Sequence, residues 1–133
     1  MIRFRRVWEG ARDRLVRWQA QARYVVAIKV LRPYRFTKGF EDFDEFDSHY
    51  PRHGREHSLF GKTAYSYARF ADSFCGAPIA DPNVILEHVK RDGTRVRCNP
   101  QARIVGVLHA NNIIGTCHVR RDALIWFRKQ ETR

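Results

Sequence analysis

Residues 84–119, VILEHVKRDGTRVRCNPQARIVGVLHANNIIGTCHV, decide the fold of this chain. Apolar and polar residues alternate within four runs, at 84–90, 94–98, 103–109 and 113–119. Between successive runs stand the triplets Arg-Asp-Gly, Asn-Pro-Gln and Ala-Asn-Asn, which favour tight turns. Alternation with a period of two, joined by short turns, predicts a four-stranded antiparallel meander.

The residues before this meander carry helix signals. Thr63 is a good N-cap for a helix over 64–75, and Gly76 is a natural stop at its C-terminal end. A shorter helix is predicted over 43–53. This order of elements predicts an α+β fold, with N-terminal helices packed on a four- to five-stranded antiparallel β-meander. Residues 123–129 add either a fifth strand or a closing helix.

The N-terminal part of the chain holds most of the positive charge. The formal net charge is +11, and residues 1–38 carry 11 of the 25 Lys and Arg but only two acids, a net charge of +9. From Phe4 to Val25 apolar residues recur at alternating spacings of four and three, which predicts an amphipathic helix ended by Pro33. We therefore divide the chain into a basic amphipathic helical extension at 1–38 and a domain at 39–133. The helix either contacts RNA or a membrane surface, or it packs against the domain or links it to another.

The excess of positive charge indicates an anionic partner, which is nucleic acid, an anionic membrane surface or an acidic protein. The first apolar run, at 24–31, is short and contains Lys29, so neither a classical signal peptide nor a membrane span is expected. Cys75, Cys98 and Cys117 are odd in number and widely spaced, which predicts neither a disulfide framework nor a zinc site. No metal or cofactor is expected.

Histidines recur every four residues at His49, His53 and His57, so a helix would place them on one side. No glutamate stands where the HExxH metal motif requires one, and Pro51 and Gly54 interrupt regular helix geometry, which makes metal binding the weaker interpretation. A histidine has an ordinary pKa of about 6.5 and accepts a proton near neutral pH. One of the three is therefore a candidate base; the alternative is a histidine that only forms hydrogen bonds between helices.

Strand alternation also sorts the polar residues of the meander. Arg95 and Arg97 share one face of the second strand, and Thr116, His118 and Arg120 share one face of the fourth. If the helices cover the apolar side of the sheet, these polar side chains form a basic cleft. Arginines with an interleaved hydroxyl and imidazole bind a phosphate through charge-assisted hydrogen bonds. The alternative is that the arginines mark a solvated face.

Four short motifs follow one another in the span 49–119. They are Arg52-His53-Gly54, a helix that starts Thr63-Ala64-Tyr65, Lys90-Arg91-Asp92-Gly93 with Arg95 and Arg97, and Gly115-Thr116-Cys117-His118. In this order they resemble the colicin D-like and related barnase, EndoU and RelE-type (BECR) ribonuclease toxin domains of bacterial contact-dependent and polymorphic toxins. The resemblance covers about half of the chain.

The resemblance implies a metal-independent endoribonuclease toxin, with tRNA as the leading substrate, that produces a 2′,3′-cyclic phosphate by attack of the 2′-hydroxyl. His53 would be the general base or acid, Thr116 would position the scissile phosphate, and Arg97 would stabilise charge in the transition state. His118 stands where the family often has an aromatic residue; it would stack on a base or protonate the leaving oxygen. Further basic residues would bind the substrate: Arg52, His49, Arg95, Arg91 and Arg120.

Such an enzyme endangers the cell that makes it, so the resemblance also implies an acidic immunity protein or antitoxin that covers the basic cleft. The enzyme would be cytoplasmic, either in the producer, bound to this immunity protein, or in a target cell after delivery. The alternative, from a different class, is a non-catalytic basic RNA-binding or membrane-surface adaptor in which the N-terminal helix carries the function.

Overall fold

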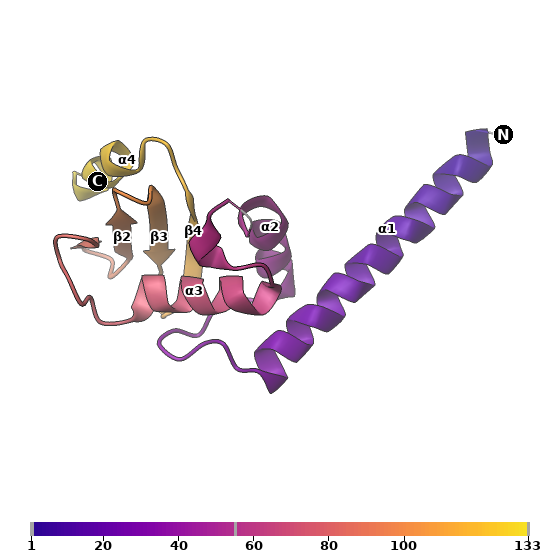
Figure 1. Ribbon diagram of the computed structural model, residues 1–133, viewed down its shortest axis with the longest axis horizontal. Helices are drawn as coiled ribbons and strands as arrows, with labels where there is room; N and C mark the ends of the chain where they lie inside the picture. The colour runs from indigo at the N-terminus through magenta and orange to yellow at the C-terminus, as the bar shows by residue number, and fades with distance from the viewer. Residues whose placement is uncertain (1, 55, 133) are drawn as a thin grey trace.

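The strands form one antiparallel sheet that follows most of the helices along the chain, in a computed structural model that describes residues 2–54 and 56–132 (Figure 1). The elements, in chain order, are α1 (Ile2–Val25), the π-helical turn η1 (Val26–Val30), α2 (Phe43–His53), the 3₁₀ turn η2 (Ser58–Phe60), α3 (Ala64–Gly76), β1 (Leu86–Val89), β2 (Arg95–Asn99), β3 (Ile104–Leu108), β4 (Ile114–Val119) and α4 (Ala123–Glu131). This arrangement confirms the α+β fold, and the last element is a helix rather than a fifth strand. Among the described residues, no helix has both the length and the apolar character needed to cross a bilayer.

The pairing of the strands decides which side chains share a face. The sheet runs in the order β1-β2-β3-β4, so β1 and β4 are its edges. Gly106 of β3 pairs with Arg97 on one side and with Cys117 on the other, and Val105 pairs in the same way with Cys98 and His118. Since side chains alternate along a strand, Arg97 and Cys117 lie on one face of the sheet, and Cys98 and His118 lie on the other.

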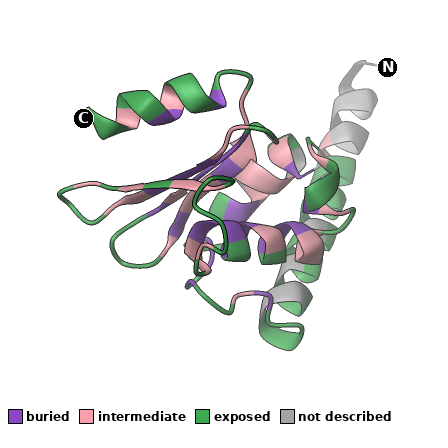
Figure 2. Ribbon diagram, turned by 60° about the vertical axis from the view of Figure 1, so that its left-hand side comes forward, coloured by how far each residue is buried: buried purple, intermediate pink, exposed green. Residues whose placement is uncertain are grey.

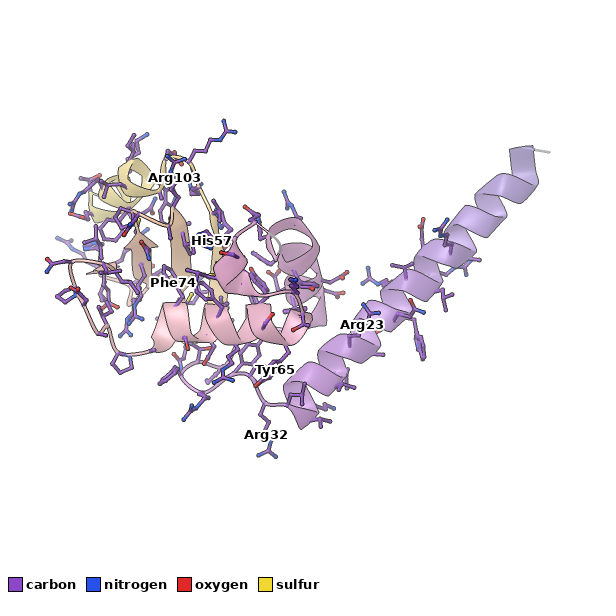
Figure 3. All side chains as sticks on the ribbon, in the orientation of Figure 1. Arg23, Arg32, His57, Tyr65, Phe74 and Arg103 are labelled. Carbon is purple, nitrogen blue, oxygen red and sulfur yellow. The ribbon has the colours of Figure 1, made fainter. Side chains whose placement is uncertain are left out.

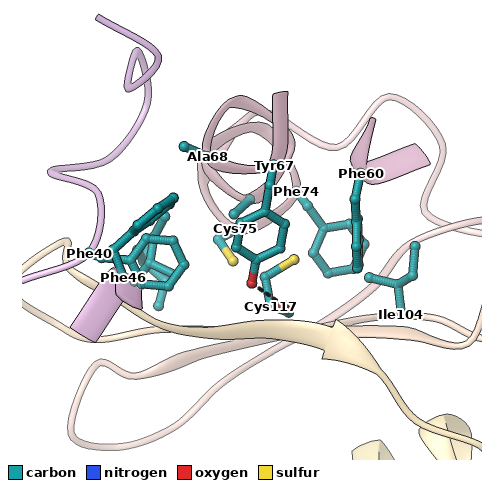
Figure 4. Packing of buried hydrophobic residues seen from close by; sticks show 12 residues of the cluster. Phe40, Phe46, Phe60, Tyr67, Ala68, Phe74, Cys75, Ile104 and Cys117 are labelled. Carbon is teal, nitrogen blue, oxygen red and sulfur yellow. Dashed lines mark hydrogen bonds between the residues drawn. The ribbon is translucent and has the colours of Figure 1, made fainter. Parts of the chain in front are cut away.

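Helix α3 covers the face that carries Cys117. Its buried residues Tyr67 and Phe74 pack on β3 and β4 in the larger of two apolar clusters. The Tyr67 hydroxyl donates a hydrogen bond of 2.6 Å to the carbonyl of Cys117, which ties the helix to the edge strand (Figure 4). A Cβ atom at Gly106 would lie 2.8 Å from Cδ1 of Phe74, so the close approach of α3 to β3 requires glycine there.

Helix α4 covers the opposite face, the one that carries His118. Its buried residues Ala123 and Phe127 pack against Val96 and Cys98 of β2 in the smaller apolar cluster. Buried residues therefore lie on both sides of the central strands, while the described part of α1 is mostly exposed (Figure 2). The sheet has no open polar face at its centre.

Helices α2 and α3 both begin at a side-chain cap. Thr63 Oγ1 accepts a hydrogen bond of 3.0 Å from the amide of Ser66, which confirms the predicted N-cap of α3. Asp42 caps α2 in the same way by accepting from the amide of Glu45 at 3.0 Å. Helix α2 runs through Pro51 without the predicted interruption and ends at His53, two residues later.

The segment before α2 is fixed to α3 by Asp72. This buried carboxylate accepts hydrogen bonds from the amides of Arg35 and Thr37, both at 2.8 Å, and from the Thr37 hydroxyl at 2.7 Å. The amide of Lys38 then donates to a carbonyl of the β3–β4 turn at 2.8 Å. Hydrogen bonds therefore hold residues 35–38 against α3 and the β3–β4 turn.

Candidate active site at the junction of α2 and β4

The end of α2 meets the edge strand β4 through two histidine rings. The imidazole of His53, the last residue of α2, stacks on that of His118 with ring centroids 4.8 Å apart and an angle of 29° between the planes. His49, one turn earlier in α2, lies 6.0 Å from His53, centroid to centroid. The structure thus brings an imidazole from the helical half of the chain to an imidazole of the sheet.

The packing of α2 explains why His53 points toward the sheet. Phe46 and Tyr50 precede His53 by seven and three positions, the spacing of one helix face, and both rings contact Tyr67 of α3, at 6.3 and 5.8 Å between centroids. Phe46 is buried, so this face of α2 is fixed against the core. His53 continues the same face and reaches the edge of β4, where the core ends.

His53 has an acidic partner that the sequence analysis did not identify. Nδ1 of His53 forms a hydrogen bond with Oε1 of Glu56, and the Glu56 amide donates to the His53 carbonyl at 3.1 Å. A carboxylate on one ring nitrogen holds the imidazole in one tautomer and directs the other nitrogen outward. A glutamate three residues after a histidine at a helix end is the signal that could have indicated this pair.

The ring of His118 is oriented by a hydrogen bond to a residue of its own strand. Its Nδ1 lies 2.8 Å from Oγ1 of Thr116, two residues earlier on the same face of β4. Burial, together with the nearby positive charges of His53, Arg120 and His49, lowers the pKa of His118 to about 4. Its imidazole is therefore neutral at neutral pH.

Both rings keep a nitrogen available for chemistry. Nε2 of His53 and Nε2 of His118 form no hydrogen bond with any residue within the described ranges 2–54 and 56–132. The His53 side chain is 23% exposed, so solvent or a ligand can reach this junction. Two imidazoles side by side, one of them held neutral by its surroundings, can accept a proton from one group and donate a proton to another.

Arg97 does not belong to this junction. It is buried on the α3 face, where its Nε pairs with Glu87 at 2.6 Å and its guanidinium donates to the carbonyls of Phe74 and Ala77 at 3.0 and 2.6 Å. The prediction of one cleft containing Arg97 and His118 is therefore wrong. The physical reason is the strand register, which aligns Arg97 with Cys117 and so places it on the face opposite to His118, where it binds carbonyls at the C-terminal end of α3.

Two further predicted ligands also lie away from the junction. Arg95 is on the same face of β2 as Arg97, with Nε 3.6 Å from Oε2 of Glu87. Arg91 is exposed in the turn between β1 and β2, at the opposite edge of the sheet from β4. Neither guanidinium is placed to contact a group bound at His53.

Among the predicted arginines, Arg52 and Arg120 lie next to the histidine pair along the chain, in α2 and directly after β4. Arg52 precedes His53 in α2 and is exposed. Arg120 follows β4, pairs with Asp122 at 2.9 Å, and lies with its guanidinium 5.6 Å from the ring centroid of Trp126. Its positive charge is one of the causes of the low pKa of His118.

His57, the third histidine of the series, has a structural contact. Its Nδ1 accepts a hydrogen bond of 3.0 Å from the amide of Leu59 and thereby caps η2, and its ring lies 6.1 Å from that of Phe60 (Figure 3). Because the chain leaves the helix after His53, His57 does not continue the α2 face. The four-residue spacing therefore brings only His49 and His53 together.

The cysteines do not contribute a reactive group to this junction. Cys75, Cys98 and Cys117 are free and buried, and burial raises the pKa of Cys98 to about 11 and that of Cys117 above its ordinary value. In the part of the chain that the structure describes, no three His, Cys, Asp or Glu side chains are grouped so as to hold a metal ion. The groups available for chemistry are imidazoles, a carboxylate, a hydroxyl and guanidinium groups.

Comparison with known proteins adds no assignment. No family model matches the chain, and no curated protein matches it significantly. The functional interpretation therefore depends on the geometry of the junction between α2 and β4.

Proposed function

We propose that this protein is a metal-independent endoribonuclease of the toxin class. The observation that supports it is the stacked pair of His53 and His118, each held through Nδ1 by a partner, Glu56 and Thr116 respectively. Cleavage of RNA without a metal needs one proton acceptor for the 2′-hydroxyl and one proton donor for the leaving 5′ oxygen. A pair of imidazoles supplies both.

The low pKa of His118 suggests how the two roles are divided. An imidazole with a pKa of about 4 is neutral at pH 7, so it serves as the acceptor and not as the donor. A bound phosphate favours the protonated imidazole and brings this pKa toward neutrality, which strengthens the base once substrate is present. His53, beside the Glu56 carboxylate, is then the donor, one of the two roles that the resemblance implied for it.

In the proposed reaction Nε2 of His118 takes the proton from the 2′-hydroxyl as the 2′ oxygen forms its bond to phosphorus. The bond between phosphorus and the 5′ oxygen breaks, and protonated Nε2 of His53 gives its proton to that oxygen. The products are a 2′,3′-cyclic phosphate and a 5′-hydroxyl. DNA lacks the attacking hydroxyl and should stay intact.

Arg52 and Arg120 are the proposed phosphate ligands. Charge-assisted hydrogen bonds from guanidinium groups offset the negative charge that develops on the phosphoryl oxygens. The phosphate would compete with Asp122 for Arg120. That the RNA is a tRNA, that an acidic immunity protein covers the site, and that the enzyme acts in the cytoplasm are proposals that rest on the resemblance of the motifs alone.

The test is incubation of the purified chain with total RNA in EDTA, followed by mapping of the cleaved ends. We expect 2′,3′-cyclic phosphate ends from the unaltered chain and, in the same time, far fewer from H53A or H118A. H88A is the matched control, because His88 lies on β1 at the other edge of the sheet. Cleavage by H118A at the rate of H88A would overturn the proposal.

A second candidate function, a non-catalytic RNA-binding adaptor, is favoured by the net charge of +9 in residues 1–38. It predicts binding that weakens steeply with salt and no cleaved ends. Removal of residues 1–32, which leaves the Asp72-bound segment in place, separates the two. Retained cleavage would support the enzyme, and loss of RNA binding with no cleavage by either form would support the adaptor.

A further inference from the structure

Helix α1 extends away from the domain (Figure 1). Its described part exposes an apolar stripe. Leu15 and Trp18 are 56% and 66% exposed, and Ala11, Ala22 and Val25 continue the same spacing of three and four. The sequence extends the pattern to its start with Phe4 and Trp8. A tryptophan two-thirds exposed beside a leucine on an isolated helix is a feature that soluble surfaces usually avoid.

Arginines border this stripe on both sides. On a helix of about 3.6 residues per turn, Arg12 and Arg23 fall along one edge of the stripe and Arg14 along the other. All three are exposed (Arg23 is labelled in Figure 3). The helix therefore presents apolar side chains between two rows of positive charge.

The stripe continues onto the domain. A shallow, mostly apolar groove between α1 and the start of α3 is lined by Ala22, Val26 and Leu31 from one side and by Ala64 and Tyr65 from the other. The near end of α1 is held by Arg17, which pairs with Asp44 of α2 at 2.7 Å. The exposed apolar surface thus runs from the free part of α1 to the domain on one side of the molecule.

We propose that α1 binds the surface of an anionic lipid bilayer, lying in its plane with Leu15 and Trp18 inserted among the lipids. A bilayer interface meets both properties of the helix, because lipid chains cover the apolar stripe while anionic headgroups pair with the flanking arginines. Tryptophan is enriched at the level of the headgroups. This function is independent of the proposed cleavage of RNA.

RNA or a second copy of the chain would match either the apolar stripe or the flanking arginines of α1, but not both. RNA would pair with the arginines but would leave Leu15 and Val16 exposed. A second copy of the helix packed along the same stripe would cover Trp18 but would bring Arg12 and Arg14 against the same positive charges of its partner. Within the described residues no helix spans a bilayer, so the proposed contact is one of lying on the surface.

The test is sedimentation of the full chain with vesicles of phosphatidylglycerol and phosphatidylcholine, compared with vesicles of phosphatidylcholine alone. We expect binding to the anionic vesicles that weakens with salt. W18E should weaken it by at least about tenfold, and R12Q by about fivefold, the factor for one arginine at an anionic surface. I125E is the matched control, since Ile125 is 61% exposed on α4, and it should bind like the unaltered chain.

Three results would overturn the proposal. The first is no binding to anionic vesicles, and the second is equal weakening by W18E and I125E. The third is a dimer in solution that W18E separates into monomers, which would assign the stripe to a second copy. Because α1 projects from the domain, W18E should keep the thermal unfolding midpoint of the unaltered chain, so loss of binding is distinguishable from misfolding.

Discussion

Arg97 and His118 are polar residues of β2 and β4, two strands of one sheet that are separated by β3, and their surroundings differ in kind. Arg97 is buried, with its guanidinium bound to one carboxylate and two helix carbonyls. His118 is partly buried, with one nitrogen on Thr116 and the other without a partner among the described residues. A polar side chain whose hydrogen bonds are filled by the protein stabilises the fold, whereas one that keeps an open nitrogen at an accessible edge can act on a ligand.

The largest expected effect is on the rate of RNA cleavage, through the histidines that keep a nitrogen without a partner among the described residues. H53A and H118A should each lower the rate of RNA cleavage by about 10²- to 10⁴-fold, the contribution of one general acid or base. The double variant should be little worse than either single one, because the two rings act as a unit. The measurement is initial rate on a defined RNA, with circular dichroism to verify the fold. If the losses in the double variant were additive, the two rings would act independently, and His118 would not differ from Arg97 by taking part in a catalytic pair.

The next largest effect is on stability and concerns Arg97, whose hydrogen bonds are all made within the protein. R97M should lower the free energy of unfolding by about 3–5 kcal/mol, because Glu87 and the carbonyls of Phe74 and Ala77 lose their partner. R95M is the control, since Arg95 has only a 3.6 Å contact with Glu87 and a side chain that is 38% exposed; it should change stability by less than about 1 kcal/mol.

Urea unfolding measures both values. The folded fraction of R97M should cleave RNA at the rate of the unaltered chain, since Arg97 faces away from the histidine pair. A stable but inactive R97M would show instead that the guanidinium acts in cleavage.

The pH dependence of stability separates the two residues further. The unfolded chain protonates His118 near its ordinary value, whereas the folded chain protonates it only near a pKa of about 4. Between these values the unfolded state binds more protons, so stability is full above about pH 6.5 and falls as the pH is lowered toward 4, by about 2–3 kcal/mol.

H118Q should remove most of this pH dependence, while R97M should leave it unchanged. Urea unfolding at pH 7 and pH 4.5 measures the difference, with H88Q as the matched control. An equal loss of stability on acidification in H118Q and in the unaltered chain would assign the effect to other groups.

The sequence predicted what depends on local pattern. The four runs between residues 84 and 119 became β1–β4, because alternation and turn residues act over a few positions. Thr63 was recognised as the cap of α3 for the same reason. Thr116 and His118 were placed on one face, and the contact of Oγ1 with Nδ1 agrees with that placement.

Prediction from sequence fails for the polar residues whose surroundings depend on which elements cover the sheet. Residues 123–129 could be read as strand or helix, and only their burial as α4 against Val96 shows that the second face is covered as well. Without that, Arg97 and His118 looked like neighbours on one polar face. The pairing of Glu56 with His53 was missed because it depends on the turn that follows α2.

The smallest of the expected effects tests this missed residue. Glu56 touches His53 and not the proposed substrate, so it is a positioning residue, and E56Q should lower the cleavage rate by about tenfold. The neutral amide can still bind Nδ1 and keep part of the ring's orientation, whereas E56A removes the partner of Nδ1 and should lower the rate further. E131Q is the control, because among the described residues Glu131 pairs with the exposed Arg128, and it should cleave at the rate of the unaltered chain. Equal rates for E56Q, E56A and E131Q would show that the contact with Glu56 does not position His53 for cleavage.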